Sequence, residues 1–316
     1  MASNLLTTEG EEFIKHICTI DSHGNDISQS NTMLQGNAPF GTPATLPFSS
    51  VQGEYPPRIW KSNATFNGKL IARNIDLVPA LIYWFNDNAD KYKIDANVLA
   101  AQAYQESKLK IWNYNPSQSS ASGISQFLFL TAYDIMIQNK GSSPKFTPEE
   151  VAILTKGLYH PPDTTIKNPN LWKTGSVVDS YRTIARSNRT IFFQTEIDNP
   201  NLMIKAQCRL LKNIQNNNIN LASVSLFLYS RGSGISNKKT YTDAITAVQT
   251  NPKLGVGYSK EGLDYVRNIF GYLGDKDNQY IKTGKPKGIW FGYGYLYLNA
   301  PFDVFKTNVI NTDIAG

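Results

Sequence analysis

Apolar residues recur at helical spacing from about residue 70, after a long stretch without any such period. A second series starts behind Asp95, a residue type that caps helix N-termini. The first series consists of Ile71, Ile75, Leu77, Leu81, Ile82 and Phe85, with Trp84 adjacent. The second consists of Val98, Leu99, Gln102, Ala103 and Glu106. Two successive helices are therefore predicted, and the second directs Glu106 near its buried side.

Three further blocks have the same period. They cover residues 202–214, 221–228 and 262–273, and the last of them places Tyr265 and Ile269 on one side. Helices joined by Gly- and Ser-rich turns, without repeats of a strand pattern, are typical of a mostly α domain. We assign this domain to residues 79–275.

Three regions depart from the helical pattern. Residues 1–78 are predicted to form a loop-rich arm, because most of this stretch is dense in Gly, Asn, Ser, Thr and Pro. Residues 138–198 read as an insertion rich in Pro and basic residues. In the tail, residues 276–316, an alternating aromatic run predicts a strand. Packing within its own domain is the simpler interpretation of that aromatic face, and stacking on sugars or docking on a partner is the alternative.

Composition places the chain among globular proteins and narrows its partners only slightly. Of the 316 residues, 41% are hydrophobic and 18% are charged. Lys and Arg exceed Asp and Glu by 31 − 25 = 6, which favours anionic partners such as a wall polymer. A nucleic-acid partner is not expected, because this charge and one arginine row (Arg182, Arg186 and Arg189) come without a binding motif.

Cysteine and histidine usage predicts neither a disulfide nor a metal site. Cys18 and Cys208 are far apart in sequence and read as unpaired thiols. The three histidines lack metal-binding spacing, so we expect no metal and no cofactor. The first twenty residues carry three glutamates and do not resemble a signal peptide. No apolar run is long enough to predict a transmembrane helix.

Glu106 carries the most informative chemistry. Glu106-Ser107 closes the second predicted helix, and a loop of Gly, Ser and Gln follows at residues 121–126. A carboxyl at the end of an apolar helix suits a proton donor for glycosidic bond cleavage, provided that a dry pocket keeps it protonated near neutral pH. Taken alone, a charged residue at a helix end is the simpler interpretation.

Four sequence segments, which occur in a particular order, favour a catalytic role for Glu106 over this simpler interpretation. They are Glu106-Ser107, residues 121–126 followed by Thr131-Ala132, residues 229–234, and residues 261–266. These segments resemble, respectively, the Glu-Ser pair, the G-A-x-G-L-M-Q loop, the Y-N-A-G-x-G turn and the E-T-x-x-Y-V segment of the lytic transglycosylase family, whose domains are goose-lysozyme-like (SLT). Each motif is weak alone, but four in order make chance a poor explanation. The resemblance covers roughly residues 80–275.

The resemblance implies a lysozyme-like α domain with a groove for a glycan strand. It also implies a role for each of five residues. By this resemblance Glu106 is the catalytic acid and base, Ser117 helps to orient it, Gln126 contacts the sugar, Tyr229 lines the cleavage site and Glu261 supports the closing helix. Three serines depart from the family pattern and leave altered or lost activity open: Ser120, Ser125 and Ser230.

The implied reaction cleaves the MurNAc–GlcNAc β-1,4 bond of peptidoglycan with one glutamate, and leaves a 1,6-anhydro-MurNAc end. Hydrolysis through a second acid, such as Asp134 or Asp163, is an alternative. A catalytically silent wall-binding or virion structural protein is another. The expected partners are glycan strands and, through the arm and the tail, other proteins of a bacteriophage virion. The expected site of action is therefore the virion or the cell wall.

Overall fold

The protein is mostly helical where a computed structural model describes it, which confirms the mostly α prediction for this part of the chain. The described residues are 4–35, 64–111, 113, 123–127, 144–150, 199–217, 265 and 269. The helices are α1 (Thr8–Thr19), α2 (Thr32–Gln35), α3 (Asn74–Tyr92), α4 (Ala96–Ser107) and α8 (Pro200–Asn217), and the strands are β1 (Thr65–Phe66) and β2 (Lys69–Leu70).

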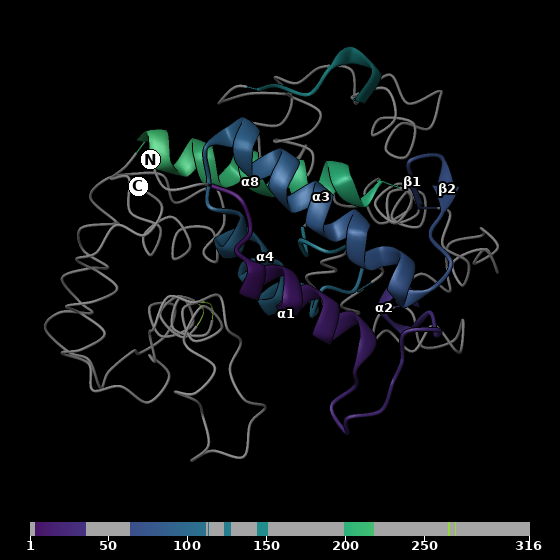
Figure 1. Cartoon of the computed structure of the whole chain (residues 1–316). Coiled ribbons are helices and arrows are strands. Elements are labelled where there is room, and N and C mark those ends of the chain that lie inside the picture. Colours follow the sequence, from purple (N-terminus) through teal and green to yellow (C-terminus); the bar gives the residue numbers. More distant parts are fainter. Residues whose placement is uncertain are drawn as a thin grey trace, which may run out of the picture.

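Helix α3 is the central element of this part of the fold. It contacts α1, α2, α4 and α8, and Figure 1 shows it crossing α8 and running beside α1. The apolar series found in the sequence forms its buried face, where Leu77, Leu81 and Phe85 have no exposed surface. The Asp76 carboxylate accepts the backbone N–H of Arg73 (3.2 Å) and closes the start of the helix.

Helix α4 begins as the sequence predicts. The Asp95 carboxylate accepts the backbone N–H groups of Asn97 (2.7 Å) and Val98 (3.4 Å), which have no partner inside the helix. Lys93, in the left-handed conformation (φ 53°), ends α3 two residues earlier. The short link between these residues sets the close packing of α3 against α4.

The loop-rich arm predicted for residues 1–78 is wrong for residues 4–35. These residues contain α1, which buries Phe13, Ile14 and Cys18 against α3 and α4. The apolar positions of α1 were obscured by three glutamates that lie on its exposed side. The domain boundary at 78/79 also falls inside α3, so residues 4–35 belong to the same packed unit as α3 and α4.

Buried asparagines join the N-terminal segment to the helices. The side-chain oxygen of Asn97 accepts the backbone N–H of Thr7 (3.1 Å) at the start of α1. The side-chain oxygen of Asn74 accepts the backbone N–H of Met33 (2.9 Å), and the side-chain NH₂ group of Asn74 donates to the backbone carbonyl of Ile27 (2.9 Å). Neither asparagine is more than 1% exposed. A loop with few apolar residues is thus held by side-chain amides that replace water at its backbone groups.

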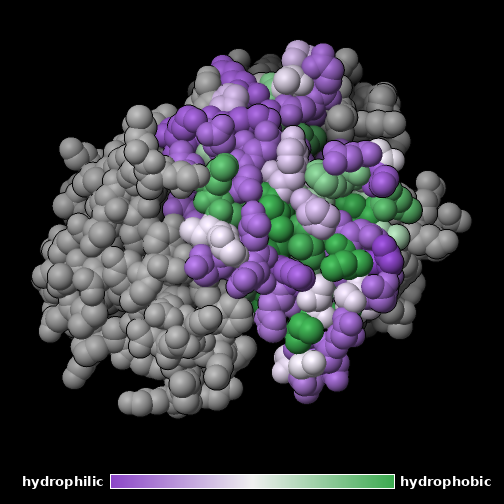
Figure 2. Space-filling view, in the orientation of Figure 1, coloured by the Kyte–Doolittle hydropathy of each residue, from purple (hydrophilic) through white to green (hydrophobic). Residues whose placement is uncertain are grey.

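Strands β1 and β2 form a two-residue hairpin that the sequence analysis did not predict. Asn67 (φ 51°) and Gly68 (φ 70°) both adopt the left-handed conformation that such a turn requires. Phe66 packs on the rings of Tyr83 and Trp84 of α3, with centroids 5.4 and 6.0 Å away. Figure 2 shows apolar side chains along α3 and toward this hairpin, with hydrophilic side chains around them.

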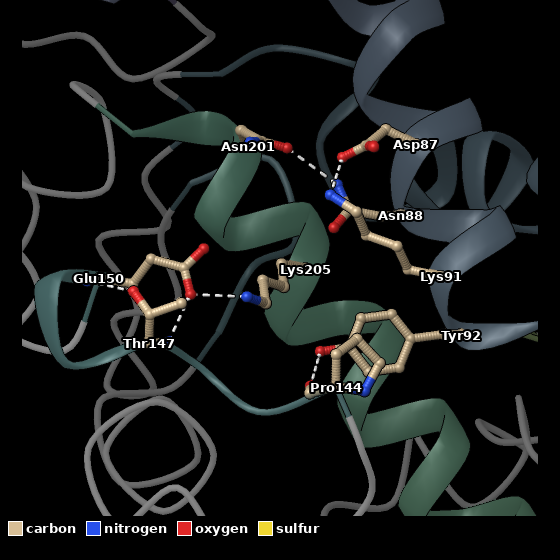
Figure 3. A network of polar contacts seen from close by, with 9 residues as sticks. All are labelled: Asp87, Asn88, Lys91, Tyr92, Pro144, Thr147, Glu150, Asn201 and Lys205. Atoms are coloured by element: carbon tan, nitrogen blue, oxygen red, sulfur yellow. Dashed lines mark hydrogen bonds and ion pairs between the residues drawn. The ribbon is translucent and has the colours of Figure 1, made fainter.

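Residues 144–150, within the predicted insertion, lie against α8 and α3 (Figure 3). The Lys205 ammonium of α8 is 2.6 Å from the Glu150 carboxylate, and the Tyr92 hydroxyl of α3 donates to the carbonyl of Pro144. Thr147 and Glu150 cap a helical turn by exchanging side-chain and backbone hydrogen bonds of 2.7 and 3.2 Å. This piece of the insertion is therefore attached to the helical core.

The predicted helix at 202–214 is confirmed as part of α8. The helix predicted at 221–228, the aromatic tail 276–316 and the rest of the insertion lie outside the described residues. Of the helix predicted at 262–273, residues 265 and 269 are described, and both are helical. Among the residues that the structure describes, no helix has the length and apolarity needed to cross a membrane.

Candidate functional site

Glu106 lies in the last turn of α4, where the chain changes direction. The Ser107 hydroxyl donates to the backbone carbonyl of Ala103 (3.0 Å), one turn earlier in the helix. Lys108 (φ 58°) and Leu109 (φ 61°) then adopt the left-handed conformation in succession. Two such residues that are not glycine are uncommon, and they end the helix directly after the turn that carries the carboxyl.

Burial makes the Glu106 carboxyl a weaker acid than an ordinary glutamate. Desolvation raises the pKa of its carboxyl from 4.5 to about 7, against two smaller effects that lower it, the hydrogen bond from Tyr265 and the charge of Lys108. The residue as a whole is partly exposed at the surface. The carboxyl is thus protonated in a large fraction of molecules at neutral pH.

Tyr265 contacts the carboxyl directly. Its hydroxyl donates to Oε1 of Glu106 over 2.5 Å, a distance at the short end of the range for hydrogen bonds between oxygen atoms. Ile269, four residues further along the chain, is also helical and is fully buried. The helical period of residues 262–273 predicts Tyr265 and Ile269 on one side of a helix, but it predicts no role for Tyr265.

Three buried side chains lie behind Tyr265 and link it to α8 and to the turn 123–127. We call them the polar chain: Gln102 of α4, Gln207 of α8 and Ser125 of the turn. None of them is more than 1% exposed. The Gln102 amide donates to the oxygen of Tyr265 (3.1 Å), and the Gln207 amide donates to the carbonyl of Gln102 (2.7 Å). The Ser125 hydroxyl is 3.0 Å from the carbonyl of Gln207.

Gln126 holds the shape of its turn. Its side-chain amide donates to the backbone carbonyls of Asn113 and Gly123, each over 2.9 Å. Its own backbone is left-handed (φ 48°), and its N–H also returns to Gly123 (3.2 Å). Both hydrogens of the amide thus stabilise the loop. Any contact between Gln126 and a sugar would use its carbonyl oxygen, which is an acceptor.

Tyr104 and α1 support the α4 end from the other side. The ring of Phe13 meets that of Tyr104 edge to face, with centroids 5.3 Å apart. The Lys108 ammonium lies 4.4 Å from the centre of the same Tyr104 ring. The N-terminal helix therefore contributes to the packing that fixes the segment carrying Glu106.

The structure describes two of the five residues that the resemblance selects, Glu106 and Gln126. Glu106 and the turn that carries Gln126 are joined through Tyr265 and the polar chain. Ser117, Tyr229 and Glu261 lie outside the described residues. The helical period places Gln102 and Gln207 on predicted helix faces, but it predicts no functional role for them. Their signal was an amide on a face that is otherwise apolar, because a buried amide needs a partner.

Neither a disulfide nor a cluster of metal-binding side chains occurs among the residues that the structure describes. Cys18 and Cys208 are free and buried, and burial raises the pKa of the Cys18 thiol to about 12. No group of three or more His, Cys, Asp or Glu side chains suited to a metal occurs among the described residues.

The arrangement can donate and retrieve a proton. A carboxyl whose pKa is close to neutral pH is suited to general acid and base chemistry, and Tyr265 can stabilise the carboxylate once its proton has left. Comparison of the chain with protein-family models, with curated proteins and with solved structures gave no match.

Proposed function

We propose that the protein is a peptidoglycan lytic transglycosylase with a lysozyme-like domain, and that Glu106 is its catalytic acid and base. The observation that supports this most is the environment of Glu106, which raises the pKa of the carboxyl to about 7 beside the Tyr265 hydroxyl. An acid that must protonate a glycosidic oxygen near neutral pH needs such a raised pKa. The four sequence segments described above support the choice of substrate.

In the proposed reaction Glu106 gives its proton to the oxygen that links MurNAc to GlcNAc. Positive charge develops at the anomeric carbon as this bond breaks. The carboxylate of Glu106 then takes a proton from the C6 hydroxyl of MurNAc, whose oxygen attacks the anomeric carbon. A 1,6-anhydro end forms without water, and Glu106 is protonated again. The hydrogen bond from Tyr265 stabilises the carboxylate between the two steps.

The bacterial cell wall is the proposed site of action, and a phage particle is the proposed carrier. The insertion at residues 138–198 supports a specialised branch of the family, and Ser120, Ser125 and Ser230 depart from the family pattern. In the described part of the chain, Ser125 is buried in the polar chain instead of facing a groove. Its hydroxyl therefore has a structural partner where the family pattern has an apolar side chain.

The test is the release of soluble muropeptides from purified peptidoglycan. We expect the wild-type protein to release them and Glu106→Gln to lose at least about a hundredfold of the rate, the range of one general acid. Glu150→Gln is the matched control, because Glu150 is also a partly buried glutamate but lies against Lys205. Equal rates for wild type and Glu106→Gln would reject an enzyme that depends on Glu106.

The mass of the product distinguishes the lytic reaction from hydrolysis. An anhydro muropeptide is lighter than the hydrolytic product by one water. Anhydro products support the transglycosylase, and reducing ends would show a hydrolytic muramidase on the same bond. No soluble product from the wild-type chain would instead favour a wall-binding protein without catalytic activity.

A further inference from the structure

We propose that the polar chain positions the hydroxyl of Tyr265 toward Glu106, so that one oxygen of the carboxyl always accepts a hydrogen bond and the other carries the proton. This inference rests on the proposed function for its catalytic consequence, but its geometry can be tested without activity. Its members are positioning residues, because they act on Glu106 through Tyr265.

The side-chain amide of Gln207 determines which groups donate and which accept in the hydrogen bonds of the polar chain. The side-chain nitrogen of Gln207 lies 3.3 Å from the backbone carbonyl of Leu99, which can only accept. The same nitrogen lies 2.7 Å from the side-chain oxygen of Gln102. This fixes which end of Gln207 is the NH₂ group, and its carbonyl end therefore faces the Ser125 hydroxyl at 3.0 Å. The single hydrogen of that hydroxyl also has the backbone carbonyl of Met203 as an acceptor at 3.2 Å.

The orientation of Gln207 fixes the next two groups. Because the carbonyl of Gln102 accepts from Gln207, its NH₂ group must face Tyr265 and donate to the phenol oxygen. That donation polarises the O–H bond of Tyr265, which makes it a stronger donor and a weaker acceptor. The phenol hydrogen is then directed to Oε1 of Glu106 over 2.5 Å.

The consequence concerns where Glu106 holds its proton. In a protonated carboxyl, the oxygen without hydrogen is the better acceptor. A donor fixed on Oε1 therefore leaves Oε2 as the hydroxyl oxygen. The acid then presents its proton from one defined oxygen instead of distributing it between two. Such fixed geometry is what proton transfer to a bound sugar requires.

The polar chain is also neutral throughout. Gln102, Gln207 and Ser125 have no ionisable groups, and each is buried. A buried ammonium in their place would lower the pKa of Glu106 strongly by its charge. Amides and a hydroxyl instead provide direction with only a small effect on the balance between acid and carboxylate.

The test is a pH titration of the Glu106 carboxyl by NMR, in protein with ¹³C-labelled glutamate side chains. Glu106→Gln identifies the resonance by removing it. We expect Tyr265→Phe to raise the midpoint of the Glu106 titration, because a hydrogen bond to the carboxylate is lost. Gln102→Met, Gln207→Met and Ser125→Ala should also raise this midpoint, and the rise should become smaller as the substituted residue lies further from Tyr265 along the polar chain.

A double substitution separates positioning from a general effect on the fold. If Gln102 acts through Tyr265, then Gln102→Met should not raise the midpoint further in a protein that already carries Tyr265→Phe. An equal rise in both backgrounds would overturn the proposal, and so would unchanged midpoints in Gln102→Met and Ser125→Ala. Ser125→Ala and Tyr265→Phe remove one oxygen each, which keeps the test valid if the glutamine variants do not fold.

The control is Asn97→Ala, which removes another buried amide of α4. Asn97 bonds to Thr7 at the other end of the helix and is not part of the polar chain. We expect it to lower stability without moving the Glu106 titration. A shift as large as that of Gln102→Met would assign the effect to helix destabilisation and overturn the proposal.

Kinetics on peptidoglycan supply the second readout. We expect Gln102→Met to lower kcat about tenfold with little change in KM, because positioning acts on the transition state and not on substrate binding. A change confined to KM would contradict a positioning role. If the wild-type protein has no activity, the proposed function fails, while the titration series still decides whether the polar chain positions Tyr265.

Discussion

Helix α8 carries two polar networks on different sides, and they differ in charge. Lys205 and Gln207 are two residues apart, so their side chains point about 200° apart around the helix. Lys205 pairs with Glu150 over 2.6 Å and holds residues 144–150 (Figure 3). Gln207 belongs to the neutral polar chain that leads to Glu106.

The two networks also differ in their contact with water. The side chains of Lys205 and Glu150 are 11% and 24% exposed, whereas Gln207 is fully buried. Partial exposure lets water share the cost of two charges, which a dry site does not allow. The comparison indicates that a charged pair, Lys205 and Glu150, is suited to attaching residues 144–150 to α8. Neutral groups are used where a nearby carboxyl must keep a raised pKa.

The largest effect should come from placing a charge in the neutral network. In Gln207→Glu a carboxylate oxygen replaces the NH₂ group that faces the carbonyls of Gln102 and Leu99. Acceptors then face acceptors in a buried site, and we expect the free energy of unfolding to fall by about 3 kcal/mol. Urea denaturation near neutral pH measures this. A loss no larger than that of Lys205→Met would remove the distinction between the two networks.

A smaller effect should come from removing the titratable group itself. The pKa of Glu106 in the folded protein is about 7, above its ordinary value of 4.5. The folded protein therefore holds this proton more tightly than the unfolded chain, and stability is lost as pH rises between the two values. Glu106→Gln avoids that loss, so we expect it to be more stable than wild type near pH 8, by about 2 kcal/mol after allowing for partial exposure.

The same variant provides its own control in acid. Near pH 4 the wild-type carboxyl is protonated in both states, and the difference in unfolding free energy should vanish. Denaturation curves across this pH range make the measurement. A constant difference at all pH values would mean that the amide changes packing and that the carboxyl does not titrate near neutral pH.

The smallest effect should come from the charged network. Lys205→Met removes the partner of Glu150, which is exposed enough to be hydrated, and we expect a loss of about 1 kcal/mol. High salt should weaken the wild-type pair and narrow the difference. Muropeptide release and the Glu106 titration should be unchanged. A shifted titration would show that the two sides of α8 are not independent.

The sequence predicted the helices whose apolar faces are long and regular. The faces of α3 and α8 and the Asp95 cap were visible because each depends on nearby residues. Helix α1 was missed since its apolar positions are few and lie among glutamates. The attachment of residues 4–35 could not be predicted, because it depends on Asn74 and Asn97 reaching segments far away in sequence.

The candidate site was predicted only in part, for a similar reason. Glu106 stood out by its position at the end of an apolar helix, and desolvation raises the pKa of its carboxyl to about 7. The partnership of Gln102 with Gln207 and Tyr265 spans more than a hundred residues. Periodicity shows that a glutamine lies on a buried face, but it does not identify the partner.

The pKa of Glu106 in the native wild-type chain is the most direct test of the central claim, that this carboxyl is protonated in a large fraction of molecules near neutral pH. It can be measured by following the side-chain carboxyl carbon of Glu106 by NMR from about pH 3 to about pH 10. We expect one transition centred near 7. A midpoint near 4.5, the ordinary value for glutamate, would contradict the claim and leave Glu106 ionised, and unable to act as the acid, at neutral pH.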